Sequence, residues 1–235
     1  MPELFSGAAR DWKFTAKFIA FSIVFFILEF AFQFYINRPG DLYASAVRSF
    51  GLTGATFIAL ALLCSPIFRF RPSLAKYWAL RRALGVAGFA FIFLHILAAM
   101  QLYFSWDVAK VYFSPNPFEN PIVFGAISFI ILIPIALTST DWAMAKMGGS
   151  WKTVQRLVYF AFWAAVFHFL TINPPQLKNP AGYFLMAITA LALLGELYWF
   201  AKTSVQKSFR GLGVLAGLVV ILLYLIATYF AWLAK

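Results

Sequence analysis

The chain has 235 residues, of which 63% are hydrophobic and only 11% are charged. This composition excludes an ordinary soluble domain and predicts a membrane protein with several spanning segments. The net charge of +11 is explained by basic residues at the membrane surface, attracted to anionic lipid headgroups, so it gives no reason to expect nucleic acid as a partner.

Apolar runs of spanning length recur along the whole chain. We expect seven transmembrane helices, at residues 14–36, 46–68, 80–104, 120–139, 153–172, 181–200 and 211–233. Such runs predict helices, because backbone in hydrocarbon must satisfy its own hydrogen bonds and barrel strands would be shorter and would alternate. The first run is too long for a secretory signal and lacks a cleavage site, so we expect it to be retained. The predicted fold class is all-α, a single polytopic membrane bundle over residues 1–235, with 211–233 as an additional C-terminal helix.

Basic residues are distributed unevenly between the two sides of the predicted bundle. One side receives only Arg38, Arg48, Lys110, Lys178 and Lys235, and the other side receives all the remaining lysines and arginines. Because cytoplasmic loops carry the excess of basic residues, the N-terminus is predicted to be cytoplasmic and the C-terminus, after seven spans, to be outside.

The only two histidines, His95 and His168, both lie inside predicted spans. They follow the starts of their helices, Leu80 and Thr153, by equal numbers of residues, so both lie about 22 Å from the cytoplasmic end. Polar residues at this depth are costly and usually functional. Two imidazoles at equal depth on parallel helices can hold one metal ion.

The number of ligands favours haem over zinc. A zinc site uses three or four protein ligands, whereas haem iron needs only two axial ligands, and the 29 phenylalanines suit an apolar macrocycle. The single cysteine, Cys64, excludes a C-x-x-C-H attachment, so any haem here is expected to be non-covalent, with His95 and His168 as iron ligands. Two alternatives stay open: each histidine bonds a backbone carbonyl or packs singly between helices, or the pair relays protons.

Several motifs around these helices are typical of one family. They are Ser65-Pro66-Ile67 with Arg69, Arg81-Arg82-Ala83-Leu84-Gly85 leading to Leu94-His95, Leu137-Thr138-Ser139-Thr140, Ala143-Met144, Gly148, Trp151, Arg156-Leu157-Val158-Tyr159 and His168. Residues 46–172 thereby resemble MsrQ, the haem-binding subunit of a bacterial methionine sulfoxide reductase system, within the ferric-reductase-like transmembrane superfamily. The resemblance implies a haem-binding core in the cytoplasmic membrane of a prokaryote, which carries electrons through b-type haem to an extracytoplasmic redox partner.

The chain departs from the family pattern at Gln155, where the motif between Trp151 and Tyr159 usually has a histidine associated with a second haem. This position lies about 20 Å nearer the cytoplasm than His168. Since glutamine is a poor iron ligand, we expect one haem near the outer face. The cytoplasmic half of the electron path is then left to FMN, a quinone, an unusually ligated haem or a partner subunit.

Further polar residues each have two interpretations. Arg48 either binds a haem propionate bidentately or anchors its helix at the headgroups. Glu29 and Glu196 either take up protons in quinone chemistry or bond to neighbouring helices and the interface. A cytoplasmic basic cluster either receives a flavoprotein or flavin phosphate, or simply follows the positive-inside rule; its members are Arg69, Arg71, Lys76, Arg81 and Arg82.

The loops leave no room for a flavin or nicotinamide domain, and no Gly-rich dinucleotide motif occurs. Electrons therefore have to come from a separate donor, either a cytoplasmic flavin reductase or the membrane quinone pool. We expect a non-catalytic electron-transfer component of an oxidoreductase system. A stand-alone ferric or quinone reductase, and a structural subunit of a larger redox complex, are the alternatives.

Overall fold

Helices dominate the computed structural model, which describes residues 12–116, 119–172 and 179–204, and no strand occurs in this part of the chain. The long helices are α2 (Trp12–Phe32), α3 (Leu42–Phe70), α4 (Trp78–Phe104), α6 (Ile122–Leu137), α8 (Gly149–Ile172) and α9 (Pro180–Ser204). The short ones are the π-helix η2 (Gln33–Asn37), the 3-10 helix η3 (Pro72–Tyr77), α5 (Val108–Val111) and α7 (Asp141–Met147).

Five helices of the described part are long and apolar enough to cross a membrane, or six if the bent pair α6 and α7 forms one span. The expectation of an all-helical, multi-pass membrane bundle is thus confirmed. The predicted span at 211–233 lies outside the described residues. The total of seven spans and the orientation of the termini stay predictions.

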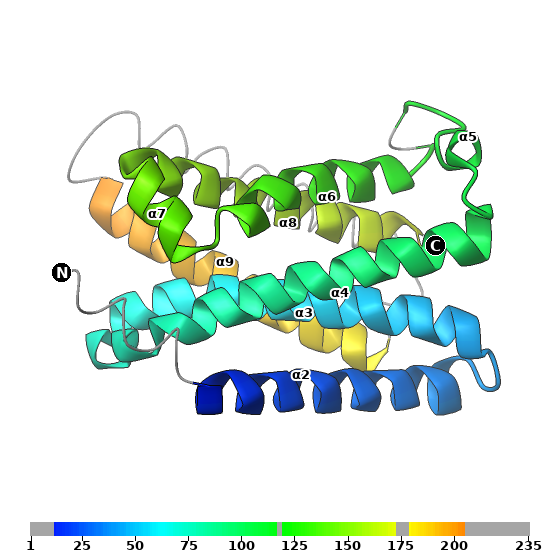
Figure 1. Ribbon diagram of the computed structural model, residues 1–235, viewed down its shortest axis with the longest axis horizontal. Coiled ribbons are helices and arrows are strands. Elements are labelled where there is room, and N and C mark those ends of the chain that lie inside the picture. Colours follow the sequence, from blue (N-terminus) through cyan, green and yellow to red (C-terminus); the bar gives the residue numbers. More distant parts are fainter. Residues whose placement is uncertain (1–11, 117–118, 173–178, 205–235) are drawn as a thin grey trace.

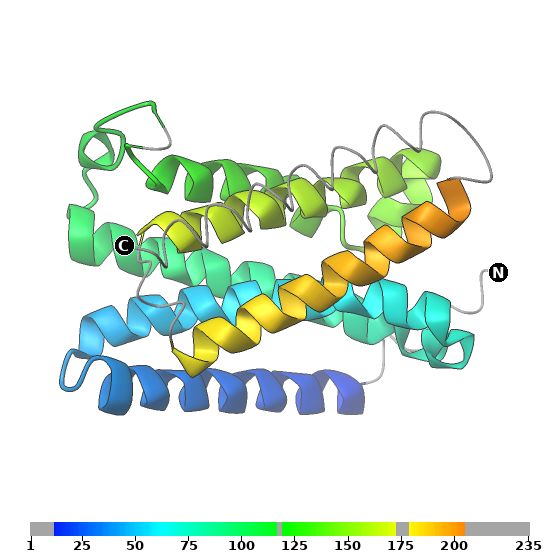
Figure 2. The ribbon, with the colours of Figure 1, turned by 180° about the vertical axis from the view of Figure 1, so that it is seen from behind.

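The long helices lie side by side along one axis, with α2 at one edge and α6 and α8 at the other (Figure 1). Seen from behind, α9 crosses the bundle obliquely (Figure 2). The main packing pairs are α3 with α4, α6 with α8, and α3 with α9, so α3 is the central helix.

Small residues allow α3 to be buried on several sides. Ser45, Ser49 and Thr53 on its buried face are fully inaccessible to solvent. Where α3 crosses α4, a Cβ on Gly54 would lie 2.9 Å from the Gly88 carbonyl oxygen, and helices approach this closely only where the side chains are small.

The predicted span at 120–139 corresponds to α6, which has only 16 residues, and α7 follows it at an angle of 89°. At about 24 Å, α6 is shorter than the hydrocarbon core. The hydroxyls of Thr138 and Ser139 donate to the carbonyls of Pro134 and Ile135, both at 2.7 Å, which ends α6. Thr140 then caps α7 by accepting the Ala143 N–H. The Thr-Ser-Thr motif therefore forms the corner between the two helices.

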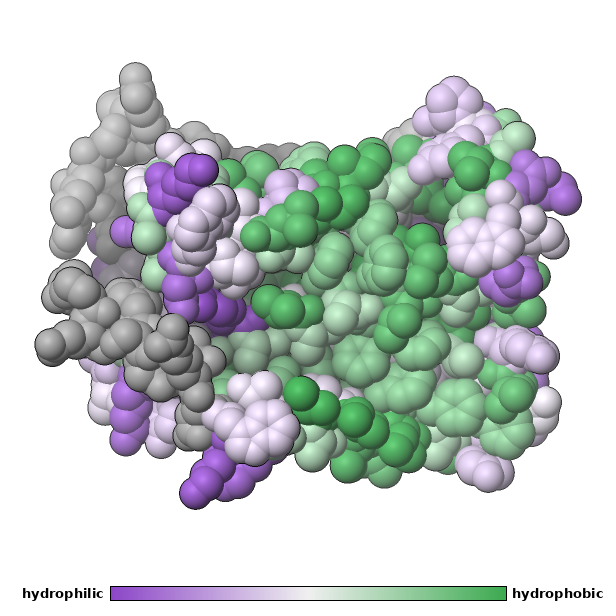
Figure 3. Space-filling model, viewed as in Figure 1, coloured by the Kyte–Doolittle hydropathy of each residue, from purple (hydrophilic) through white to green (hydrophobic). Residues whose placement is uncertain are grey.

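The surface matches a membrane environment. A broad hydrophobic band covers the middle of the visible face and hydrophilic residues gather at the two ends (Figure 3). One end carries the loops around η3 and α7, with the basic cluster, and we call it the basic end. At the opposite end, the loop between α4 and α6 includes Glu119, whose pKa is held below its usual value by hydrogen bonds from Ser114 and Asn116. A band of this kind is stable when lipid covers it.

Candidate functional site

The two histidines face each other across the bundle. His95 comes from α4 and His168 from α8, and their ring centroids are 6.4 Å apart with an angle of 69° between the planes. Two imidazoles that share one metal ion, each through a bond of about 2 Å, have ring centres about 6 Å apart. No group of three or more metal-binding His, Cys, Asp or Glu side chains occurs among the described residues. The arrangement therefore suits a metal that needs two protein ligands, such as haem iron.

Both rings are anchored through the same nitrogen. His95 Nδ1 lies 2.8 Å from the Val47 carbonyl oxygen, and His168 Nδ1 lies 3.0 Å from that of Pro121. Since a carbonyl only accepts, each Nδ1 carries the hydrogen and each neutral ring keeps the lone pair of Nε2. Metal-binding histidines commonly have this second hydrogen bond, which fixes the tautomer. A packed, metal-free histidine would make the same bond, so the close pairing of the two rings is the more informative observation.

A glycine lies under each imidazole. A Cβ on Gly51 of α3 would meet the His95 ring at 3.0 Å, and one on Gly125 of α6 would meet the His168 ring at 3.1 Å. Sequence reasoning missed both residues, because a glycine in an apolar helix does not reveal which side chain will lie on it. The available signal was the pattern of a glycine-containing helix followed by a histidine-containing one, which occurs twice.

Arg48 lies next to Val47, the residue that anchors His95. Its Nη1 atom is buried and has no hydrogen-bond partner among the described residues. The guanidinium lines a recess that Arg38 and Tyr103 also border. Asp41 lines the same recess. An unsatisfied buried donor is costly, so this atom suits an anionic oxygen, which a haem propionate or a lipid headgroup can supply. The role of Arg48 toward a haem propionate stays a prediction.

Gln155 lies in a cavity at the basic end of the bundle, with a volume of about 80 Å³. Its Nε2 donates to the Ile135 carbonyl at 3.1 Å, Thr138 Oγ1 at 3.1 Å and Ser139 Oγ at 3.4 Å. The neighbouring Trp151 donates its indole N–H to the Thr138 carbonyl at 2.9 Å. These bonds join α8 to the end of α6, where the Ile135 carbonyl also accepts from the Ser139 hydroxyl.

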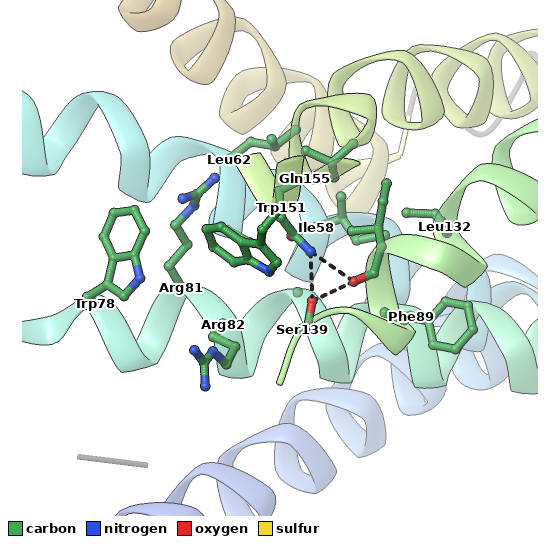
Figure 4. A pocket seen from close by; sticks show the side chains of 15 residues that line it. Ile58, Leu62, Trp78, Arg81, Arg82, Phe89, Leu132, Ser139, Trp151 and Gln155 are labelled. Atoms are coloured by element: carbon green, nitrogen blue, oxygen red, sulfur yellow. Dashed lines mark hydrogen bonds between the residues drawn. The ribbon is translucent and has the colours of Figure 1, made fainter. Parts of the chain in front are cut away.

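The basic cluster is partly neutralised. Arg82 pairs with Asp141 at 2.6 Å, and the Arg81 guanidinium lies 4.8 Å from the Trp78 ring. Figure 4 shows the Arg81 side chain between the indoles of Trp78 and Trp151, at the wall of the Gln155 cavity. The cavity thus combines aromatic walls with a cationic group.

The two intramembrane carboxylates both have polar partners. Glu196 accepts from Arg69 at 2.6 Å and from Tyr159 at 2.8 Å, which joins α9 to α3 and α8. Glu29 accepts from Gln33 Nε2 at 2.8 Å, one turn later on the same segment. Glu196 thus bonds to neighbouring helices, as one interpretation expected, whereas the partner of Glu29 lies on its own segment.

Comparison with known proteins gives a family and relatives for this chain. A profile of the family described as "Ferric reductase like transmembrane component" matches residues 45–166, a range that includes Arg48, His95 and Gln155 and ends just before His168. Two similar relatives, from Brucella ovis and Brucella melitensis, are each named "Protein-methionine-sulfoxide reductase heme-binding subunit MsrQ". Each is 33% identical over 171 residues, which cover 70% of this chain and 74% of the relative.

Proposed function

The chain belongs to the ferric-reductase-like transmembrane family and is of the MsrQ type, and on this basis we propose that it is a haem-binding electron-transfer subunit of the membrane. His95 and His168 would hold the haem iron, each through Nε2. The observation that carries this proposal is the pair of anchored imidazoles with ring centres 6.4 Å apart. A bound haem supplies a one-electron couple between ferric and ferrous iron.

The haem is non-covalent, since Cys64 is the only cysteine and leaves no pair for covalent attachment, and the family resemblance implies the b type. Arg48 binds a propionate, which would satisfy its buried Nη1 atom. Val47 and Pro121 hold the two rings in the tautomer that leaves Nε2 free.

One haem is bound, not two. The position of the family's additional histidine is taken by Gln155, whose amide N–H groups already bond to the end of α6. Arg81, Trp78 and Trp151 instead make the surrounding cavity suitable for part of a flavin or quinol, and this supports an aromatic electron donor at the basic end.

The basic residues give the orientation of the chain, and the family resemblance implies electron flow toward the extracytoplasmic side. Because the positive-inside rule puts the basic end in the cytoplasm, the donor is a cytoplasmic flavin reductase or the quinol pool, and the acceptor lies outside. The relatives' name points to a methionine sulfoxide reductase as that extracytoplasmic partner. The chain is then a component of an oxidoreductase system in the cytoplasmic membrane of a prokaryote and has no catalytic site of its own.

Haem stoichiometry tests the proposal. The protein is purified in mild detergent, and haem per chain is measured by redox difference spectroscopy for the native chain, His95→Ala and His168→Ala. Thr189→Ala, which removes a buried hydroxyl bonded to its own helix, is the control. One haem, lost in both histidine variants and kept in the control, is the expected result.

The other outcomes each contradict a specific statement. Haem retained in both histidine variants would overturn the ligand assignment, and two haems per chain would overturn the interpretation of Gln155. A chain that binds no haem would favour a structural subunit. Turnover of ferric iron or quinone by the isolated chain with a cytoplasmic donor, without any partner, would favour a stand-alone reductase.

A further inference from the structure

We propose that Gly51 and Gly125 are positioning residues for the two haem ligands, an inference that rests on the haem-binding function proposed above. Each glycine lets an imidazole lie directly against the backbone of the neighbouring helix. In that position Nδ1 reaches the carbonyl four residues before the glycine, and the ring is held with Nε2 available for iron.

The contact between α3 and His95 is the first of the two. A Cβ on Gly51 would lie 3.0 Å from His95 Nδ1, 3.2 Å from Cε1 and 3.4 Å from Cγ. Three ring atoms of His95 therefore lie against Gly51, and the contact is not made by a single atom. The same ring bonds the Val47 carbonyl, which in a helix also accepts the N–H of Gly51.

The contact between α6 and His168 repeats this arrangement. A Cβ on Gly125 would lie 3.1 Å from His168 Nδ1, 3.2 Å from Cγ and 3.3 Å from Cε1. The ring bonds the Pro121 carbonyl, again four residues before the glycine. The pairs α3–α4 and α6–α8 thus hold their histidines in the same way, and the two rings meet between them.

General helix packing does not account for these glycines. Other described glycines with crowded Cβ positions face a neighbouring helix at a crossing point, as Gly54 faces Gly88 and Gly195 faces Pro66. Gly51 and Gly125 are crowded by histidine ring atoms instead. Their absent side chains make room for the ligands.

The hydrogen bond from Nδ1 to the carbonyl determines what an alanine would change. A methyl group at 3.0–3.1 Å from Nδ1 forces the ring outward by a few tenths of an ångström and weakens that bond. Since the bond raises the basicity of the coordinating nitrogen, its weakening destabilises ferric haem more than ferrous haem. The midpoint potential is therefore expected to rise in both variants.

The test compares Gly51→Ala and Gly125→Ala with two controls. Gly149→Ala places its methyl group in open space on α8, and Gly195→Ala crowds Pro66 between α9 and α3. For each purified protein we would measure haem per chain, the electron paramagnetic resonance spectrum of the ferric form and the midpoint potential. We expect roughly a tenfold weaker preference for ferric haem in the first two variants, which is a rise of about 59 mV for a one-electron couple, with an altered low-spin spectrum. Both controls should keep the native spectrum and potential.

Each remaining outcome is decisive. Native spectra and potentials in Gly51→Ala and Gly125→Ala, or equal shifts in Gly195→Ala, would overturn the positioning role. If either variant loses haem, thermal unfolding of the haem-free proteins is compared. A native-like Tm in the variant supports local positioning. A large decrease in Tm that haem-free Gly195→Ala shares overturns it. If the native protein itself binds no haem, the proposed function fails, and that result is visible before any variant is compared.

Discussion

Replacement of Gln155 by leucine removes the amide that joins α8 to the end of α6. Hydrogen bonds between membrane helices contribute about 0.6 kcal/mol on average and up to about 1.7 kcal/mol. Gln155 has two N–H donors and three oxygen acceptors within 3.4 Å, from Ile135, Thr138 and Ser139. We therefore expect a loss of about 1 to 2 kcal/mol, or a five- to thirtyfold shift in the unfolding equilibrium.

Thermal unfolding in detergent, followed by circular dichroism, measures this loss as a decrease in Tm of roughly 2 to 8 °C. Haem per chain should not change, because Gln155 lies about 20 Å along α8 from His168. Thr153→Val, at an exposed position of the same helix, is the matched control and should leave Tm unchanged. A Gln155→Leu protein with native Tm and less haem would refute the reasoning, since it would make Gln155 a contributor to haem binding and not a link between helices.

Two further stability predictions concern the basic end. Tyr159→Phe removes the 2.8 Å hydrogen bond to Glu196 and should cost about 1.5 to 3 kcal/mol, because the acceptor is a carboxylate, whereas Tyr198→Phe at an exposed position should cost almost nothing in the same thermal assay. Equal losses of stability in the two variants would show that the hydrogen bond to Glu196 does not stabilise the protein. Gly148→Ala should cost about 1 to 3 kcal/mol, since φ is 53° and ψ is −122° in this connection between α7 and α8. Gly149→Ala, which also meets open space but has no positive φ, is its control, and a Gly148→Ala protein as stable as that control would contradict the strain argument.

Much of the fold could be predicted from the sequence because each membrane helix is indicated by its own run of apolar residues. A run of about twenty apolar residues predicts a span wherever its neighbours lie, and five long helices were found at predicted runs. The run that differs is 120–139, where α6 has only 16 residues and α7 begins after the run, at Asp141. The run gives the hydrophobic length, but the end of α6 also depends on the hydroxyls of Thr138 and Ser139 and on the α8 side chains that bond there.

Some features of the candidate site could likewise be predicted from the sequence, and others required the tertiary structure. By itself the sequence determined the two histidines, their matching depth and the exclusion of covalent haem, because helical rise and residue counts are independent of packing. Tertiary structure alone decided that Val47 and Pro121 anchor the rings, that Gly51 and Gly125 lie under them, and that Gln155 and Glu196 have helix partners. The partner of a side chain on another helix depends on how the helices cross and rotate, and that information is distributed over the whole bundle rather than carried by any one segment.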